Sequence, residues 1–354
     1  MLLKLPYFLY KRRMLISAGD RYWQRKMSGK GLELDGRRLN PRAQGLFELM
    51  ALFAVPAKYW TPANMRAGYR KSVQLFDGPK PGVKDVHDIM INLPGRDIKA
   101  RLYDNIPGSD PKPCLLYFHG GGFVIGDLET HDGLCRRLAR ETGHRVLAID
   151  YRLGPEHRFP AAMDDAVDSW VWLQQNAARL NIDPERISVS GDSAGAVLAL
   201  LVSAKASHGQ MGNIPLSTEL IYPADLTVKS TASRELLGGE DILLTKELMD
   251  WFNGQFTSDE MSIAHPHLNA LDNAVSGNMP PTWILTCGFD PLRDDGKLIA
   301  EKLKSKGAQV AFTEYSDLYH GFIGAGALFS EVDDMVLGMG DFIRQHLNNK
   351  KEAD

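Results

Sequence analysis

The sequence predicts an α/β fold: a mostly parallel, doubly wound sheet of eight strands with a helical cap. The chain has 354 residues, and its later part alternates short apolar or β-branched runs with longer helical patterns. Such alternation is typical of parallel strands joined by crossover helices. The first eighty residues lack it, and Pro41, Pro56 and Pro62 interrupt them. We therefore expect a helical N-terminal cap over residues 1–80 and an α/β domain over residues 81–354.

The expected elements follow one another in a regular order. The strands are expected at residues 85–93, 97–104, 114–119, 145–150, 186–190, 218–222, 282–287 and 309–315. The helices are expected at residues 130–142, 161–179, 194–207, 292–306 and 331–347. A hairpin-like turn at residues 94–97 joins the first two strands, so the sheet should begin antiparallel. Residues 225–260 lack strand character and contain a helical run from Thr245 to Phe256, which predicts a second piece of the cap.

A serine between a strand and a helix is the first candidate for chemistry. Residues 191–195 read Gly-Asp-Ser-Ala-Gly, after a β-branched run and before a segment rich in Ala, Leu and Val. Strand, sharp turn and helix form the context of a nucleophile elbow. The flanking glycines permit close backbone approach, so that the hydroxyl projects at the carboxyl edge of the sheet. We predict Ser193 as a nucleophile.

A serine hydroxyl needs a base, and the base needs an orienting partner. Asp290 and His320 each follow an apolar strand-like run, and such loops collect catalytic residues in open α/β sheets. The order serine, acid, histidine is one of the known triad orders. His157 precedes the serine and breaks that order. We therefore predict Asp290 as the acid and His320 as the base.

A glycine triplet after the third expected strand is suited to bind negative charge. No Cβ obstructs a substrate oxygen at such a triplet, so its N–H groups can point at that oxygen. We expect an oxyanion hole made by the N–H groups of Gly121, Gly122 and Ala194, the last at a helix start. Candidates for contact with the substrate are Phe123, Asp192, Tyr222 and Phe322.

Composition excludes several other classes of protein. The formal net charge is −3 and no basic stripe points to nucleic acid. Cys114, Cys135 and Cys287 are odd in number and two lie in expected strands, which favours reduced packing residues and a cytoplasmic location. No Cys/His cluster has zinc spacing, so no metal is expected. We place the acid pair at 294–295 at a helix start, and the pair at 164–165 in a solvated helix turn.

The first ten residues are mostly apolar and precede Lys11-Arg12-Arg13. A secretion signal has its charge before the apolar run, and this run is short and broken by Lys4 and Pro6. A helix that lies on a lipid surface is an alternative, because aromatic and basic residues suit that role. We prefer a cap segment folded over the active site. No run is long enough to span a bilayer.

Five motifs together resemble the hormone-sensitive-lipase-like carboxylesterases, a family of α/β-hydrolases. They are HGGGFVIGDLETHD (119–132), DYRLGPEHRFPAAMDD (150–165), GDSAGAVLAL (191–200), DPLRDDG (290–296) and YHGF (319–322). The similarity covers most of the chain and is greatest to bacterial acetyl esterases. Many relatives have Gly where this chain has Ala196, and Ala where it has Gly154.

The resemblance implies a serine carboxylesterase that hydrolyses short-chain acyl esters through an acyl-enzyme on Ser193, with no cofactor. It also implies that residues 150–160 form a buried, salt-bridged loop beside the oxyanion loop. A homodimer is compatible with the sequence. Two other functions stay open: a lipase at a membrane surface, and a non-enzymatic ligand receptor on the same fold. Receptors of that kind have lost the triad histidine, whereas this chain has His320.

Overall fold

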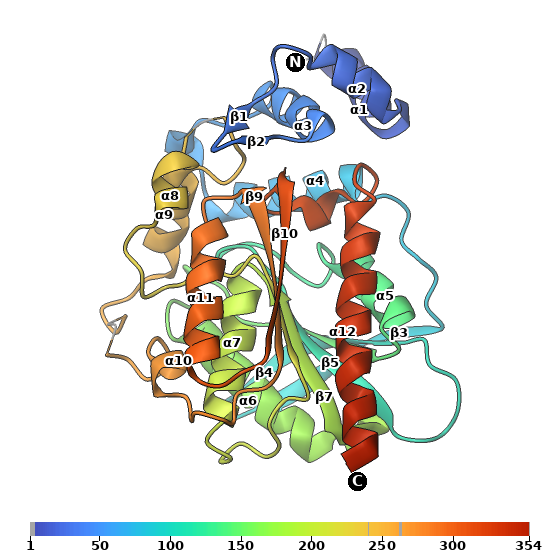
Figure 1. Cartoon of the computed structure of the whole chain (residues 1–354), viewed down its shortest axis with the longest axis vertical. Coiled ribbons are helices and arrows are strands. Elements are labelled where there is room, and N and C mark those ends of the chain that lie inside the picture. Colours follow the sequence, from blue (N-terminus) through green and yellow to red (C-terminus); the bar gives the residue numbers. More distant parts are fainter. Residues whose placement is uncertain (1–3, 240, 262–263, 354) are drawn as a thin grey trace.

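The computed structural model describes residues 4–239, 241–261 and 264–353. Residues 1–3 of the expected cap and residue 240 of the expected insertion lie outside this part. Within it, an eight-stranded sheet runs through the molecule and helices cover both of its faces (Figure 1). This architecture confirms the predicted fold class.

The strand order is β10-β9-β8-β7-β5-β6-β4-β3. The bounds are β3 (Asp85–Leu93), β4 (Arg96–Asp104), β5 (Lys112–Phe118), β6 (Arg145–Asp150), β7 (Ile182–Asp192), β8 (Thr218–Ile221), β9 (Thr282–Phe289) and β10 (Val310–Tyr319). β4 runs antiparallel to β3, as the turn at residues 94–97 predicted, and also to β6, and the other neighbours are parallel. The parallel strands therefore end at one common edge, where loops can bring distant residues together.

Two layers of helix enclose the sheet (Figure 1). One face is covered by α6 (Ala161–Asn176), α7 (Ala194–Ala206), α10 (Ala270–Asn273) and α11 (Arg293–Ser305), and the other by α5 (Asp132–Glu141) and α12 (Glu331–Ala353). Short 3₁₀ turns lie at η2 (Ala178–Leu180) and η3 (Phe322–Ala325). Helix α7 is buried almost all round, because it lies between the sheet and α6. Its Ala, Leu and Val residues suit that position.

The N-terminal region forms a separate group of helices at one end of the molecule (Figure 1). Its elements are α1 (Lys4–Ser17), α2 (Asp20–Lys26), β1 (Glu33–Leu34), β2 (Arg37–Arg38), α3 (Pro41–Ala51), η1 (Ala57–Tyr59) and α4 (Pro62–Phe76). The side chains of Asn40 and Thr61 cap the starts of α3 and α4. Phe47 of α3 packs edge-on against Tyr319, with ring centres 4.9 Å apart. The region therefore lies against the end of β10.

A second set of covering elements follows β8. It contains α8 (Ala232–Leu236) and α9 (Lys246–Phe256) within the expected insertion. Arg234 of α8 pairs with Asp295 of α11, and the Ser233 N–H donates to Asp294 at 2.9 Å. The acids at the start of α11 thus hold the insertion to the domain.

Asp165 corrects one expectation from the sequence. It was expected in a solvated helix turn, but it is fully buried and pairs with Arg96 at 2.5 Å and Arg152 at 2.9 Å. A buried carboxylate requires such partners, because an unpaired charge in the interior is costly. None of the helices in the described ranges is apolar over a length that could cross a membrane.

Candidate active site

Ser193 lies at the sharp turn between β7 and α7. Its backbone angles, φ 53° and ψ −119°, fall in a region that non-glycine residues rarely adopt. Such a conformation costs of order 1–3 kcal/mol and persists only where the surroundings enforce it. The Ser193 N–H donates to the Ile221 carbonyl at 2.8 Å, and a Cβ on Gly195 would overlap the Phe118 carbonyl. The turn therefore depends on glycine at position 195.

Asp290, His320 and Ser193 form a continuous hydrogen-bonded line. His320 Nδ1 is 2.7 Å from Asp290 Oδ2, and His320 Nε2 is 2.8 Å from Ser193 Oγ. Asp290 is fully buried, and its other oxygen accepts the Leu292 N–H at 2.7 Å. With Nδ1 protonated toward the carboxylate, Nε2 is left as an acceptor for the serine proton.

The glycine loop after β5 is folded so that its amides are available. The Gly121 carbonyl accepts from the N–H groups of Val124 and Ile125, at 3.0 and 2.9 Å, and Gly121 has φ 121°. Within the described residues, the N–H groups of Gly121, Gly122 and Ala194 have no hydrogen-bond acceptor. These are the three donors expected from the sequence.

A buried carboxylate supports this loop from below. Asp192 Oδ1 accepts from the Gly120 N–H at 2.8 Å and from the Tyr117 hydroxyl at 2.7 Å. His131 Nε2 lies 3.3 Å from the same oxygen. Burial raises the pKa of Asp192, but His131 and the hydrogen bonds outweigh it, and the pKa lies below its ordinary value. Asp192 is therefore ionised under the glycine loop.

The two buried histidines beside this carboxylate have opposite protonation tendencies. Burial lowers the pKa of His131, but the Asp192 carboxylate outweighs burial and the net pKa lies above its ordinary value. Burial lowers the pKa of His119 to about 4, so that ring is neutral. His119 stacks on Tyr151 at 4.3 Å, and the Tyr151 hydroxyl donates to the His119 carbonyl at 2.7 Å. Both histidines thus brace the loop.

The four candidates for substrate contact, Phe123, Asp192, Tyr222 and Phe322, mainly contact other residues of the protein. None is more than 4% exposed. The Phe123 ring stacks on Phe256 of α9, and Asp192 lies beneath the glycine loop as described. The Tyr222 ring centre lies 4.4 Å from that of His320, with Phe322 behind it. Their contact with a substrate stays a prediction.

Helix α4 is tethered to the loop that follows the glycine triplet. Arg66 donates to the carbonyls of Val124 and Gly154, each at 2.8 Å, and pairs with Glu156 at 2.6 Å. Arg70, one turn later, pairs with Asp127. Two arginines therefore fix this helix beside the site, and neither contact was predictable from the sequence.

Helix α9 covers the glycine loop from above. A Cβ on Gly122 would lie 2.5 Å from the Phe252 ring, so this ring rests directly on the loop. Trp251 packs edge-on against Trp60, with ring centres 6.1 Å apart. The N-terminal region and the insertion thus meet above the site. The apolar residues of the expected helix were a signal for such a cover, but they did not indicate which surface it meets.

Residues 150–160 are only partly the buried, salt-bridged loop that the resemblance implied. Arg152 pairs with buried Asp165, but Glu156 is about half exposed and Arg158 donates to the Gly254 and Thr257 carbonyls at the end of α9. His157 is exposed. A Cβ on Gly154 would lie 2.7 Å from the Gln255 carbonyl oxygen. This loop therefore holds the covering helices as well as the sheet.

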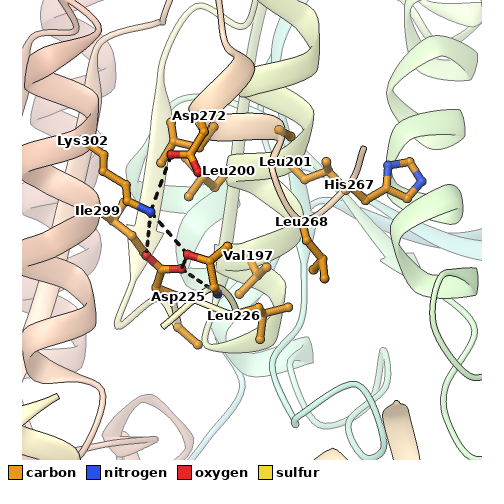
Figure 2. A pocket seen from close by; sticks show the side chains of 14 residues that line it. Val197, Leu200, Leu201, Asp225, Leu226, His267, Leu268, Asp272, Ile299 and Lys302 are labelled. Carbon is orange, nitrogen blue, oxygen red and sulfur yellow. Dashed lines mark hydrogen bonds and ion pairs between the residues drawn. The ribbon is translucent and has the colours of Figure 1, made fainter. Parts of the chain in front are cut away.

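A cavity of about 50 Å³ lies elsewhere, between α7, α10 and α11 (Figure 2). Apolar side chains such as Val197, Leu200 and Ile299 line it. At its polar side Lys302 pairs with Asp225 at 3.3 Å and lies 3.7 Å from Asp272. None of the triad residues lines this cavity.

Comparison with known proteins agrees with this geometry. A family model described as alpha/beta hydrolase fold matches residues 115–324. The carboxylic ester hydrolase LipN of Mycobacterium tuberculosis is 36% identical over 304 residues, which are 84% of this chain and 80% of that protein. An ethyl acetate hydrolase of Pseudomonas putida is 32% identical over 287 residues, 80% of this chain and 89% of its own.

Solved structures agree as well. A hyperthermophilic esterase from the archaeon Pyrobaculum calidifontis superposes with a TM-score of 0.81 at 35% identity. The match covers 87% of this chain and 98% of that structure.

Proposed function

We propose that this chain is a serine carboxylesterase for esters with short acyl chains. The chain belongs to the α/β-hydrolase fold family and is a carboxylic ester hydrolase of the hormone-sensitive-lipase-like type. The observation that carries the serine mechanism is the line from Asp290 through His320 to Ser193, with contacts of 2.7 and 2.8 Å. An orienting acid, a base and a nucleophile in direct contact are the parts that acyl transfer needs.

In the proposed reaction, Ser193 Oγ attacks the ester carbonyl carbon while His320 Nε2 takes its proton. The carbonyl oxygen becomes an oxyanion, which the N–H groups of Gly121, Gly122 and Ala194 stabilise. His320 then gives its proton to the leaving alcohol, and Ser193 keeps the acyl group. A water molecule then attacks the acyl carbon while His320 takes its proton. The bond from the acyl carbon to Ser193 Oγ breaks, His320 returns that proton to Ser193, and the acid leaves. Asp290 stabilises the imidazolium in both halves.

The preference for short acyl chains has two supports. One relative of this chain is an ethyl acetate hydrolase, whose name specifies a two-carbon acyl group. The other is the cover itself, because Phe252 rests directly on Gly122 and restricts the space above the expected oxyanion hole. Restricted space beside the reacting carbon favours small groups.

The same proposal includes two properties outside the site. The three cysteines are buried and unpaired, which supports a reducing, cytoplasmic location. A homodimer, which is compatible with the sequence, is also part of this proposal, and light scattering on the purified chain would decide it.

The serine mechanism is tested with Ser193→Ala. This change removes one oxygen without adding bulk, so ester turnover should fall at least about a thousandfold while the fold remains. A serine-directed organophosphate should add its mass to the peptide that contains Ser193. Ser190→Ala is the matched control, because that buried serine lies on β7, three residues before Ser193, and its hydroxyl has no partner within the described chain. A fully active Ser193→Ala enzyme would exclude the proposal.

The acyl preference is tested with a series of p-nitrophenyl esters on the unmodified protein. The highest kcat/KM is expected between acetyl and hexanoyl. A maximum at dodecanoyl or longer would contradict the short-chain proposal and favour the lipase alternative, with the serine mechanism unaffected.

A further inference from the structure

The first thirty residues are far more basic than the rest of the chain. They contain eight Lys or Arg residues and a single acidic residue, Asp20, whereas the whole chain has a net charge of −3. Asp20 is already paired with Arg42 of α3. Arg13, Arg21 and Arg25 are exposed. The excess positive charge of α1 and α2 therefore faces solvent.

Large apolar side chains are exposed in the same region. Tyr7, Leu9 and Tyr10 of α1 are between 46% and 57% exposed, and Tyr22 of α2 is 39% exposed. Phe53, just after α3, is 42% exposed and packs edge-on against Phe8, with ring centres 5.1 Å apart. Most of the large hydrophobic side chains that the folded domain leaves exposed lie before residue 60. Such a concentration marks an interaction surface.

The basic and aromatic groups are interleaved. Lys11 lies over the Tyr7 ring at 5.2 Å, and Lys26 lies over the Tyr22 ring at 5.8 Å. Burial, and then the neighbouring Lys11, lower the pKa of Lys26. Glu48 is the acid that acts on this pair. Two lysines held close together with little counter-charge favour an anionic partner.

We propose that this surface, formed by the exposed side chains of α1 and α2 together with Phe53, docks the protein on an anionic lipid bilayer. Aromatic rings at a water–hydrocarbon boundary, with Lys and Arg at the lipid phosphates, are the chemistry of interfacial binding. Leu9 and Phe53 favour lipid over nucleic acid, whose grooves offer little apolar surface. A second copy of the chain is disfavoured, since two surfaces of equal positive charge repel each other.

Docking would also orient the enzyme. Asn40, which begins α3, donates to Asp317 at 3.1 Å, and Phe47 packs on Tyr319, the residue before His320. The basic region thus lies at the end of the molecule where the catalytic strands end (Figure 1). Bound lipid would therefore face the end of the molecule that holds Ser193 and His320. This inference concerns location and does not depend on the catalytic assignment.

The test is co-sedimentation of the full chain with vesicles of phosphatidylcholine alone, or with about one-third phosphatidylglycerol. Binding is expected only to the anionic vesicles, and should weaken when NaCl rises from about 50 to about 500 mM. Arg13→Glu with Arg25→Glu should lower the affinity at least about twenty-five-fold, since each of the two lost basic residues contributes about fivefold. The control, Lys229→Glu with Lys304→Glu, makes the same charge change elsewhere and should stay within about twofold.

Tyr7→Ser with Tyr10→Ser should weaken binding to anionic vesicles while the salt dependence is kept. Hydrolysis of a water-soluble acetyl ester should be unchanged in every variant, which reports correct folding. Equal binding of the control and Arg13/Arg25 variants would overturn the proposal. Binding to double-stranded DNA without binding to vesicles, or loss of a dimer as the sole effect of the variants, would also overturn it.

Discussion

The catalytic edge of the sheet and the helices that cover it are stabilised differently. At the edge, Asp192 and Asp290 are buried, and their partners include Tyr117 of β5, Gly120 of the glycine loop and His320 after β10. In the cover, Arg66 and Arg70 reach from an exposed helix to loop carbonyls and partly exposed carboxylates. Buried polar groups are costly to disturb, whereas exposed ion pairs contribute about 0–1 kcal/mol.

This difference separates two kinds of property. The edge fixes the positions of the proposed reacting groups, where small displacements cost large factors in rate. The cover decides which substrates reach them. Changes at the edge should therefore alter kcat, and changes in the cover should alter KM and substrate preference.

The largest effect is expected at the edge itself. His320→Ala should lower kcat at least about a thousandfold, because among the described residues no other side chain hydrogen-bonds Ser193 Oγ and could take its proton. His157→Gln is the control, since that histidine is exposed in the loop beside α9. A larger loss from the His157 variant would contradict the assignment of the base.

The next effect concerns a buried acid with no cationic partner. Burial raises the pKa of Glu219, in β8, to about 8, and Ser217 donates to it at 2.6 Å. The folded state keeps this proton at a pH where the unfolded chain releases it, so stability falls as pH rises from about 4.5 to about 8.

Glu219→Gln removes this pH dependence. The free energy of unfolding is measured with urea at about pH 5 and about pH 9. Between these two pH values, the variant should become more stable relative to the unmodified protein by at least about 2 kcal/mol. Glu301→Gln changes an exposed acid of α11, and its free energy of unfolding should change with pH as that of the unmodified protein does. If the free energy of unfolding of Glu219→Gln kept the pH dependence of the unmodified protein, the buried acid would not titrate as described.

A smaller effect on kcat is expected from Asp192, the buried carboxylate that binds the glycine loop. Asp192→Asn keeps the shape but removes the negative charge that binds the Gly120 N–H, Tyr117 and His131. The glycine loop should lose its position, lowering kcat about tenfold with little change in KM. Asp183→Asn, at the other end of β7, should leave both constants unchanged. A change confined to KM would assign Asp192 to substrate binding instead.

The smallest effect is expected in the cover. Arg66→Gln loses the contacts to Val124, Gly154 and Glu156, so α4 should move more freely above the site. KM for acetyl esters should rise about threefold and longer esters should gain relative to them, while organophosphate labelling of Ser193 keeps its rate. Lys71→Gln, an exposed charge on the same helix, should change neither. A large fall in kcat would show that the cover also positions the proposed catalytic residues, which would contradict the division between cover and edge.

The same division decides how much the sequence reveals. The eight strands and the order of the candidate triad were predictable, because each of Ser193, Asp290 and His320 directly follows its own strand. Such a pattern is local, and backbone geometry alone places the ends of parallel strands at one edge. The hydrogen bonds among these residues follow from that placement.

The contacts of the cover were not predictable for a physical reason. Arg66 reaches a carbonyl 58 positions later in the chain, and a charged residue on a helix normally indicates a solvated face. Asp165 was misplaced in the same way, because its partner Arg96 lies 69 positions away. The hairpin β1–β2 has two residues in each strand, too few for a period-two pattern to appear.

The contact between Gly154 and the Gln255 carbonyl also bears on how the enzyme can diversify. A single methyl group at position 154 would force the end of α9 outward, and Phe252 on that helix rests on the glycine loop. The proposed reacting groups would keep their positions, while α9 would move away from the glycine loop and enlarge the space above it. Laboratory selection for bulkier esters can therefore begin with one conservative codon change that leaves the reaction machinery intact.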